Sequence, residues 1–404
     1  MKTIAILGTF DTKGVELEAV AGMIRASGFN VLRIDVGSGS PTVAVDITAP
    51  EVAACAEEDW RAIRARQDRG EWVALIARAS ALHLQGLVER GAIQGVLSLG
   101  GGGGTAIATA AMRSLPIGFP KVMVSTLASG NVAPYIGTSD IVMIPAVVDV
   151  AGMNRISRVI FGNAAGAICG MVQAAGDYRE KNDRPVVVAS MFGNTTDCVN
   201  EARRLMEAAG KEVLVFHSTG QGGKAMEALI ASGLVSGVLD VTTTEWADEL
   251  VGGILTAGPE RLSAAAKAGV PAVIAPGCLD MVNFGEPQTV PARFAGRLFY
   301  QHNPQVTLMR TNAAECAELG RILAEKLNAY SAPVRVFWPK GGVSLLSAPG
   351  QPFYDPDADA ALLDALKSSL CPKIEVRELD YAINHPAFAR ACVESLLSLI
   401  EALG

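Results

Sequence analysis

The sequence has 404 residues, 50% of them hydrophobic and only 19% charged, with a net charge of −7 at pH 7. This length exceeds the size at which one hydrophobic core usually divides into two domains, and the low charge content is typical of large buried parallel sheets. Without a basic tract or a run of about 18 apolar residues, neither nucleic acid nor a membrane is an expected partner. Seven scattered cysteines without a CxxC pair, and an N-terminus that predicts a strand rather than a secretion signal, indicate a reducing cytoplasm.

In chain order, the first half alternates short apolar runs with amphipathic stretches, which is the pattern of βαβ units and a parallel sheet. The predicted strands are residues 3–8, 30–37, 93–100 and 121–126. The predicted helices are residues 13–28, 81–91 and 104–115.

The second half repeats this plan. Residues 185–218 match residues 3–36 element for element. The predicted fold class is therefore α/β, with two Rossmann-like domains that have mainly parallel sheets and are related by internal duplication. The polar stretch 176–185 is the expected boundary, which gives domains at 1–180 and 184–404. The first copy also carries an inserted segment near residues 40–72, for which a lid and an oligomer contact are equally open.

The stretch LSLGGGGGTAIATAA, residues 97–111, places five consecutive glycines between a predicted strand and a predicted helix. Ligands of open parallel sheets bind beyond the carboxyl ends of the strands. Amides without neighbouring side chains can approach a ligand closely, and a helix start adds partial positive charge, so the run favours a phosphate cradle over a plain turn. No Gly-Lys-Ser/Thr follows, so the run is not a P-loop, and a nicotinamide dinucleotide is only weakly supported.

Further polar residues end the neighbouring predicted strands of the first domain. Lys13 could neutralise a phosphate, while Asp11 could hold Mg²⁺ through water or cap the following helix. Asp35 ends a strand at a position that often holds a ribose, and Arg78 could reach an anion or be solvated. The candidate ligand-binding residues at this edge are Thr9, Asp11, Thr12, Lys13, Asp35, Arg78, Gly101, Gly102, Gly103, Gly104, Thr105, Ser125, Ser129, Gly130, Asp149 and Asn154.

The second predicted domain has an edge that is richer in titratable groups. An acid, a histidine and a thiol on one edge could carry acid–base or nucleophilic chemistry, although a structural role is open for each. A metal held by His217, Asp240 and His302 is an alternative that no motif supports. The catalytic candidates are His217, Glu245, Asp240, Cys278 and His302. The candidate ligand-binding residues of this domain are Thr219, Gly220, Gly222, Gly223, Thr244, Gly277, Arg310 and Lys340.

Several of these stretches together resemble an uncharacterised family of two-domain bacterial and fungal proteins, whose module also forms the amino-terminal ATP-binding region of the tomato mosaic virus resistance protein. The resemblance rests on GTFDTKG, GGGGGT, PYIGTSD, HSTGQGGKAMEALI, PGCLDMVNFG, HNPQVTLMRTN and GGVSLL…GQPFYDPDAD. It implies that the first domain binds ATP with Mg²⁺, and that residues 9–13 and 101–105 line the nucleotide site. One departure is INHP, which places His385 where such chains are expected to have Asn-Asp-Pro.

Two hypotheses of function remain, because the resemblance implies no reaction. In the first, the protein is an ATP- and Mg²⁺-dependent enzyme that acts on a small carboxylate or phosphate metabolite between the two domains. In the second, it is a non-catalytic protein whose domain orientation or homo-oligomeric state responds to the nucleotide. A weaker third hypothesis is action on a partner protein.

Overall fold

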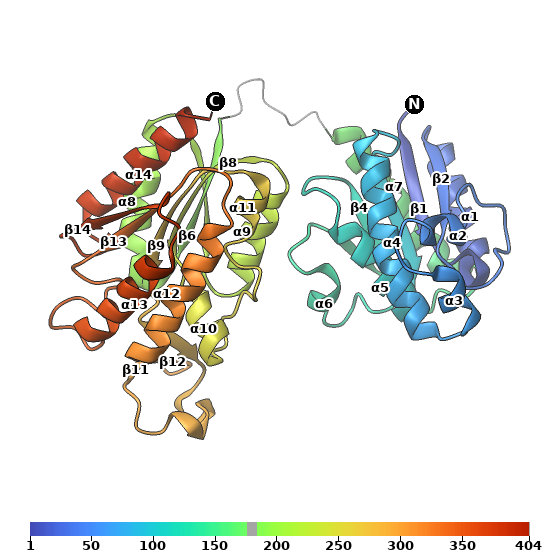
Figure 1. Cartoon of the computed structure of the whole chain (residues 1–404). Helices are drawn as coiled ribbons and strands as arrows, with labels where there is room; N and C mark the ends of the chain where they lie inside the picture. Colours follow the sequence, from blue (N-terminus) through green and yellow to red (C-terminus); the bar gives the residue numbers. More distant parts are fainter. Residues whose placement is uncertain (176–183, 404) are drawn as a thin grey trace. The chain divides into compact units, whose positions relative to one another are not determined.

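The computed structural model describes residues 1–175 and 184–403. The chain divides into two compact units, Met1–Lys181 and Asn182–Gly404, called unit 1 and unit 2 below (Figure 1). Most of the polar stretch that is expected to separate the domains, residues 176–183, lies outside the described residues.

Unit 1 contains a five-stranded parallel sheet with the strand order β2-β1-β3-β4-β5. Its strands are β1 (Thr3–Gly8), β2 (Asn30–Asp35), β3 (Gly95–Gly100), β4 (Lys121–Ser125) and β5 (Val142–Pro145). Its helices are α1 (Phe10–Ala26), α2 (Ala49–Ala53), α3 (Trp60–Ala65), α4 (Arg69–Glu89), α5 (Gly102–Arg113), α6 (Ala133–Ile136) and α7 (Arg155–Ala174).

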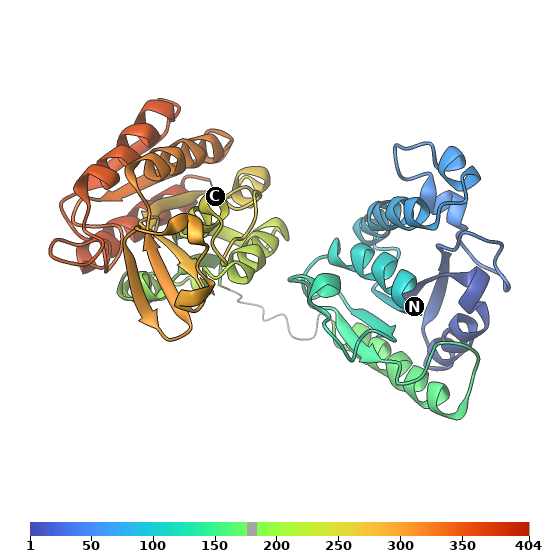
Figure 2. The ribbon, with the colours of Figure 1, turned by 90° about the horizontal axis from the view of Figure 1, so that it is seen from below.

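Helices cover both faces of the unit 1 sheet (Figure 2). Successive side chains of a strand point to opposite faces, so the apolar run of β1 serves two cores. Ile4 and Ile6 pack with residues of α1 and α7, whereas Ala5 and Leu7 pack with residues of α4 and α5. A strand that is buried on both sides explains why the sequence of β1 is continuously apolar.

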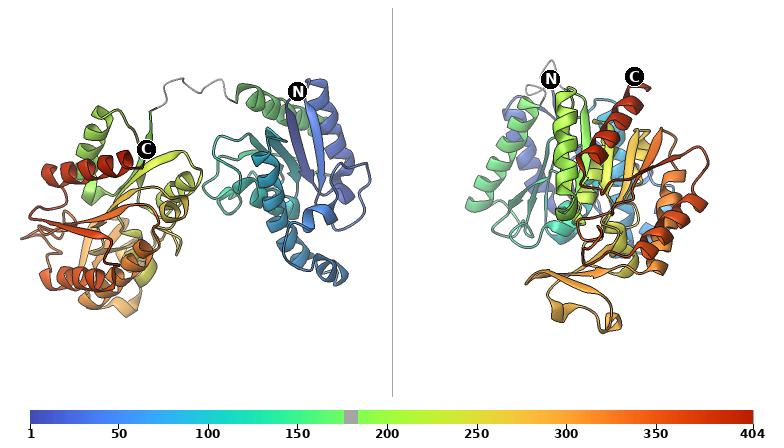
Figure 3. Two further views of the ribbon diagram at one scale, coloured as in Figure 1. Left: turned by 45° about the horizontal axis from the view of Figure 1, so that its top comes forward. Right: turned by 90° about the vertical axis from the view of Figure 1, so that its left-hand side faces the viewer.

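Unit 2 contains a six-stranded parallel sheet in the order β14-β13-β9-β8-β6-β7 and a three-stranded antiparallel sheet in the order β10-β12-β11, which extends from its lower end in Figures 1 and 3. The strands are β6 (Val186–Met191), β7 (Glu212–His217), β8 (Val235–Thr242), β9 (Ala272–Gly277), β10 (Met281–Phe284), β11 (Phe299–Asn303), β12 (Val306–Arg310), β13 (Val334–Pro339) and β14 (Glu375–Leu379). The helices are η1 (Gly193–Thr195), α8 (Thr196–Ala208), α9 (Gln221–Ala231), α10 (Glu245–Val251), α11 (Ala264–Ala268), η2 (Pro287–Thr289), η3 (Ala292–Phe294), α12 (Ala313–Asn328), α13 (Pro356–Ser369) and α14 (Pro386–Glu401).

The two parallel sheets share one strand order. Read from β7, the unit 2 sheet runs β7-β6-β8-β9-β13, which repeats the order β2-β1-β3-β4-β5 of unit 1. The predicted fold class, two Rossmann-like α/β domains with mainly parallel sheets, is confirmed, and the shared order agrees with a duplicated plan.

Three helices begin earlier than the sequence pattern predicts. Helix α1 starts at Phe10 rather than at residue 13, so Asp11 and Lys13 lie in its first turn. Helix α4 starts at Arg69 rather than at residue 81, because Asp68 caps it by accepting the amide of Glu71 at 3.0 Å. Helix α5 starts at Gly102, so three glycines of the run form its first turn. Over the described ranges, no helix is long and apolar enough to cross a membrane.

Candidate functional site

The turn between β3 and α5 is built almost entirely from backbone. The strand ends at Gly100, Gly101 is the N-cap residue, and the helix follows at once. The amide of Thr105 donates to the carbonyl oxygen of Gly101 at 2.8 Å, which closes the first helical bond. The amides of residues 101–104 have no acceptor in the described part of the chain, as expected for the start of a helix.

These amides border a pocket of ≈ 340 Å³ at the carboxyl edge of the unit 1 sheet. This volume is within the range of about 300–1,000 Å³ that small-molecule sites occupy. Several chain segments that are distant in sequence form its wall. The lining residues are Thr9, Asp11, Thr12, Lys13, Val36, Ser38, Arg69, Trp72, Val73, Gly100, Gly101, Gly102, Gly103, Gly104, Ile107 and Asp149.

Asp11 and Lys13 belong to the first turn of α1, directly after β1. Asp11 accepts the amide of Gly39 at 2.8 Å through Oδ2, while its Oδ1 is buried. Lys13 has non-helical backbone angles, φ −127° and ψ 19°, and its ammonium group donates to the carbonyl oxygen of Val150. The ammonium group therefore ties α1 to the loop that carries Asp149.

The inserted segment supplies wall residues that the sequence analysis missed. Arg69, Trp72 and Val73 belong to its end and to the first turns of α4. Trp72 is buried, and its Nε1 donates to the carbonyl oxygen of Val36 at 3.4 Å. The segment follows β2, and the carboxyl ends of parallel strands share one edge of the sheet. Its position in the chain therefore indicates that it lies near the binding edge.

Asp35 and Arg78, which the sequence also suggests as binding residues, are not among the residues that line the pocket. Asp35 is buried and accepts the amides of Phe10 and Gly37 at 3.0 and 2.9 Å. Burial raises its pKa, while these hydrogen bonds oppose the rise. Arg78 pairs with Glu58 on an exposed face at 2.5 Å. The polar atoms of both side chains are therefore engaged by protein groups rather than directed to a ligand.

The remaining predicted residues of unit 1 lie in the first turn of α5, at the end of β4, in the turn after β4 and at the start of α7. Thr105 and Ser125 are buried and share a hydrogen bond of 2.7 Å beneath the glycine turn. Ser129 and Gly130 are exposed in the turn after β4. Asn154 is the N-cap of α7 and accepts the amides of Ile156 and Ser157, both at 2.9 Å.

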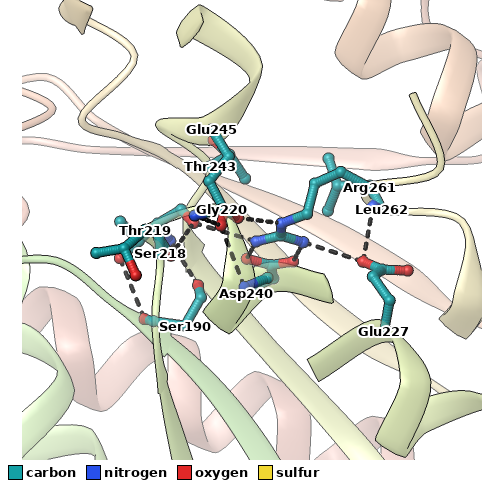
Figure 4. Close-up of polar contacts among 12 residues, drawn as sticks. Ser190, Ser218, Thr219, Gly220, Glu227, Asp240, Thr243, Glu245, Arg261 and Leu262 are labelled. Atoms are coloured by element: carbon teal, nitrogen blue, oxygen red, sulfur yellow. Dashed lines mark hydrogen bonds and ion pairs between the residues drawn. The ribbon is translucent and has the colours of Figure 1, made fainter. Parts of the chain in front are cut away.

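In unit 2, the protein's own carboxylate occupies the glycine turn that precedes α9. Glu245 Oε1 accepts the amides of Gly220 and Gly223 at 2.7 and 3.1 Å (Figure 4). A Cβ atom on Gly223 would come within 2.2 Å of Glu245 Oε2, so glycine is required for this approach. The amides of this turn bind an anionic group, and that group is the carboxylate of Glu245.

Glu245 belongs to a buried ion cluster around Arg261 (Figure 4). Arg261 contacts Glu245 at 2.6 Å, Asp240 at 2.7 Å and Glu227 at 3.1 Å. Glu227 also accepts three amides at the start of α11. Burial raises the pKa of Glu245, and the nearby Arg261 opposes the rise.

The other catalytic candidates of unit 2 do not form one group with this cluster. Cys278 is buried with φ +60°, and burial raises the pKa of its thiol well above the usual value, so a thiolate nucleophile is disfavoured. His302 is exposed on β11 in the antiparallel sheet. His217 is exposed at the end of β7, with its ring 6.2 Å from that of Phe192.

Most ligand candidates of unit 2 also have protein partners, except Thr244, whose hydroxyl is buried without a hydrogen-bond partner among the described residues. Arg310 donates to the carbonyl oxygen of Phe353 at 2.9 Å and pairs with Asp359 at 2.6 Å. Lys340 pairs with Asp380 at 2.5 Å on the surface. Thr244 and Gly277 are buried, Gly222 lies against the backbone of His217, and Thr219 donates its hydroxyl to the His217 carbonyl at 3.3 Å. Among the described residues, no cluster of three potential metal-ligating side chains occurs.

Fold and site together define a two-domain, Rossmann-like α/β protein with a polar pocket at the carboxyl edge of its first sheet. Residues 2–177 match the description "Uncharacterised protein family (UPF0261) N-terminal domain", and residues 184–400 match the C-terminal domain of the same family. The chain belongs to this family, which confirms the resemblance that the motifs indicated.

Similar proteins match the chain over nearly its whole length. A UPF0261 protein of Rhizobium meliloti is 48% identical and covers 97% of this chain and 98% of its own. A UPF0261 protein of Clostridium tetani is 46% identical and covers 99% of each. The ToMV resistance protein Tm-1 of tomato is 39% identical over 97% of this chain but only 55% of its own length, so this chain spans about half of the tomato protein.

Solved structures give weaker matches. A UDP-GlcNAc 2-epimerase from Methanocaldococcus jannaschii is 8% identical, covers 68% of this chain and 83% of its own, and has a TM-score of 0.21. A score this low supports no inference about the ligand of this protein.

Proposed function

We propose that unit 1 is a nucleotide-binding domain that takes ATP with Mg²⁺ in the pocket at the β3–α5 turn. The observation that supports the proposal most is the group of backbone amides at residues 101–104, which have no acceptor in the described parts of the chain and border a pocket of suitable size. Amides at a helix start bind phosphate through their hydrogens and the partial positive charge of the helix.

The charges of the pocket wall fit a polyphosphate. Lys13 and Arg69 supply two cations, and Asp11 and Asp149 supply two carboxylates. The backbone amides of the glycine turn and the two cations would donate hydrogen bonds to phosphate oxygens. The bonds from the cations would be the stronger ones, because charged donors make stronger hydrogen bonds.

The residues present also fit a magnesium ion that is bound mainly through the ligand. Mg²⁺ in such sites usually keeps several waters and is held by one or two carboxylates and by the phosphates. Asp11 Oδ1 is buried without a hydrogen-bond partner among the described residues, and Asp149 lines the same pocket. Bound Mg²⁺ would neutralise charge on the phosphate oxygens, while Asp11 would hold it in place.

The contacts of unit 2 support the non-catalytic alternative over the enzyme. Asp240 and Glu245 are committed to Arg261, and Cys278 is a buried neutral thiol. A catalytic base or nucleophile needs a free electron pair within reach of a substrate, which these three groups do not offer. His217 and His302 are exposed, but they lie on different sheets, on β7 and β11. We therefore propose that the nucleotide acts as an effector rather than as a substrate of unit 2 chemistry.

The experiment is a thermal-shift and calorimetric titration of the full chain with ATP, ADP, AMP and inorganic phosphate, with and without Mg²⁺. We expect stabilisation by Mg²⁺-ATP that grows with concentration, amounting to about 2.7 kcal/mol at 100 times the dissociation constant. Lys13→Met should weaken binding, whereas Lys267→Met, at an exposed ion pair of unit 2, should not. Absence of stabilisation by every nucleotide would refute the proposal, and steady ATP turnover would favour the enzyme.

A further inference from the structure

The inserted segment places Arg69 in the pocket wall, and the charge of its guanidinium group is not used in an ion pair among the described residues. Arg69 is the first residue of α4, and it has no hydrogen-bond or ion-pair partner within residues 1–175 and 184–403. Its neighbours differ, because Arg64 donates to the carbonyl oxygen of Ser38 at 3.1 Å, Arg66 pairs with Glu71 at 2.6 Å and Arg78 pairs with Glu58. Arg61 also has no such partner among the described residues, but its guanidinium group lies over the ring of Trp60 and not in the pocket wall, so Arg69 is the unpaired arginine of this segment that lines the pocket.

The position of Arg69 over the glycine turn is specific. Its Nη2 atom lies 3.3 Å from the point that a Cβ atom of Gly103 would occupy. Gly103 is not in the left-handed region, so its backbone conformation does not demand glycine. The absent side chain instead leaves room for the guanidinium group beside the amides of residues 101–104 that lack acceptors.

We infer that Arg69 is a phosphate clamp that makes the pocket select nucleotides with a polyphosphate chain over nucleoside monophosphates. This inference rests on the nucleotide-binding function proposed above. The amides of the turn provide a first set of donors for phosphate oxygens, and Arg69 provides a second set from another segment. An arginine presents two parallel N–H groups to a phosphate, which a lysine cannot do. The inserted segment thus has a role in ligand selection.

The test compares Arg69→Met, Arg69→Lys and a matched control in binding titrations with Mg²⁺-ATP and with AMP. The control is Arg61→Met, because Arg61 belongs to the same segment but lies over the ring of Trp60, outside the pocket wall. We expect Arg69→Met to weaken ATP binding roughly 10- to 100-fold. Arg69→Lys should retain part of the affinity, AMP binding should change much less, and Arg61→Met should bind as the wild type does.

The outcomes separate this inference from the function on which it rests. If the wild type binds ATP and Arg69→Met binds it equally well, the clamp is refuted and the nucleotide site stands. If Arg69→Met weakens AMP as much as ATP, selection by chain length is refuted. If the wild type binds neither nucleotide, both proposals fail. A melting temperature of unliganded Arg69→Met equal to that of the wild type would show that the loss is not structural.

Discussion

The turn after β3 in unit 1 and the turn after β8 in unit 2 have the same place in a repeated strand order, yet they differ in content. When Gly95 of β3 is aligned with Gly237 of β8, Gly103 of unit 1 and Glu245 of unit 2 occupy equivalent positions. The unit 1 turn has amides without acceptors in the described residues and borders a pocket. In unit 2, a run of buried threonines and Glu245 fills the corresponding space.

The comparison teaches that one topology can serve either binding or stability, depending on which side chains the turn carries. Glu245 reaches the neighbouring glycine turn and satisfies its amides at Gly220 and Gly223. In unit 1, no side chain of the turn can do the same, since residues 100–104 are all glycine. Four substitutions or conditions test this difference.

The largest expected effect follows from removing the cation of the unit 2 cluster. Arg261→Met leaves Asp240, Glu245 and Glu227 without their shared partner in a buried site. Breaking a buried ion pair by removing one partner usually costs about 3–5 kcal/mol. Urea unfolding should therefore show a loss of this size in the unit 2 transition, while nucleotide binding by unit 1 is unchanged. Equal loss in both units would contradict the assignment of the cluster to unit 2 alone.

The larger pH dependence of stability is expected in unit 2, although the buried Asp35 of unit 1 also has a raised pKa. Burial raises the pKa of Asp248 to about 7 and that of Asp280 to about 6, whereas residues 99–112 of unit 1 contain no titratable side chain. Because an unfolded carboxyl group has a pKa of about 3.9, the folded state holds more protons between these values. The stabilisation that these two buried carboxyl groups contribute is fully present below about pH 3.9. It is lost as the pH rises through 6 for Asp280 and through 7 for Asp248, by roughly 2–4 kcal/mol for Asp248.

The check is urea unfolding of the wild type and of Asp248→Asn at pH 5 and pH 8. Asparagine keeps an acceptor for the amide of Asn283, which Asp248 binds at 2.9 Å. The variant should lose most of the difference between the two pH values and should keep the part due to Asp280. An undiminished difference in Asp248→Asn would assign the pH dependence to other groups.

A carboxylate introduced into the glycine turn of unit 1 should make it resemble the turn of unit 2. Gly103→Glu places a carboxylate beside Arg69 and the amides of residues 101–104, where it competes with phosphate. We expect about a 100-fold loss of ATP affinity, which is ~2.7 kcal/mol, with little change in the stability of the unliganded protein. The matched control is Gly166→Glu, at an exposed position of α7 where a Cβ atom has open space. Unchanged affinity in Gly103→Glu would argue against this turn as the phosphate site.

The sequence predicts most of the fold because the buried strands and the repeated plan are visible as apolar runs and matched spacings. It also points to residues Asp11–Lys13 and to the glycine run as parts of the pocket wall, since strand ends share one edge of a parallel sheet. It does not predict that Glu245 fills the second glycine turn, because that contact joins two loops 22 residues or more apart. Nor does it assign Arg69, because only the start of α4 brings this residue to the pocket.

The smallest expected effect is the partial rescue by acetate of a unit 2 turn that has lost its carboxylate. Glu245→Ala removes the carboxylate that accepts the amides of Gly220 and Gly223 and leaves a cavity beside Arg261. The unliganded variant should be less stable than the wild type, and acetate should restore part of the loss because it supplies a carboxylate of fitting size. A recovery of about 1 kcal/mol corresponds to acetate at a few times its dissociation constant, measured by urea unfolding against chloride at equal ionic strength. If acetate stabilises the variant no more than the wild type, the amides of this turn do not bind carboxylate on their own, and the open turn of unit 1 would need Lys13 and Arg69, rather than its amides, to hold a phosphate.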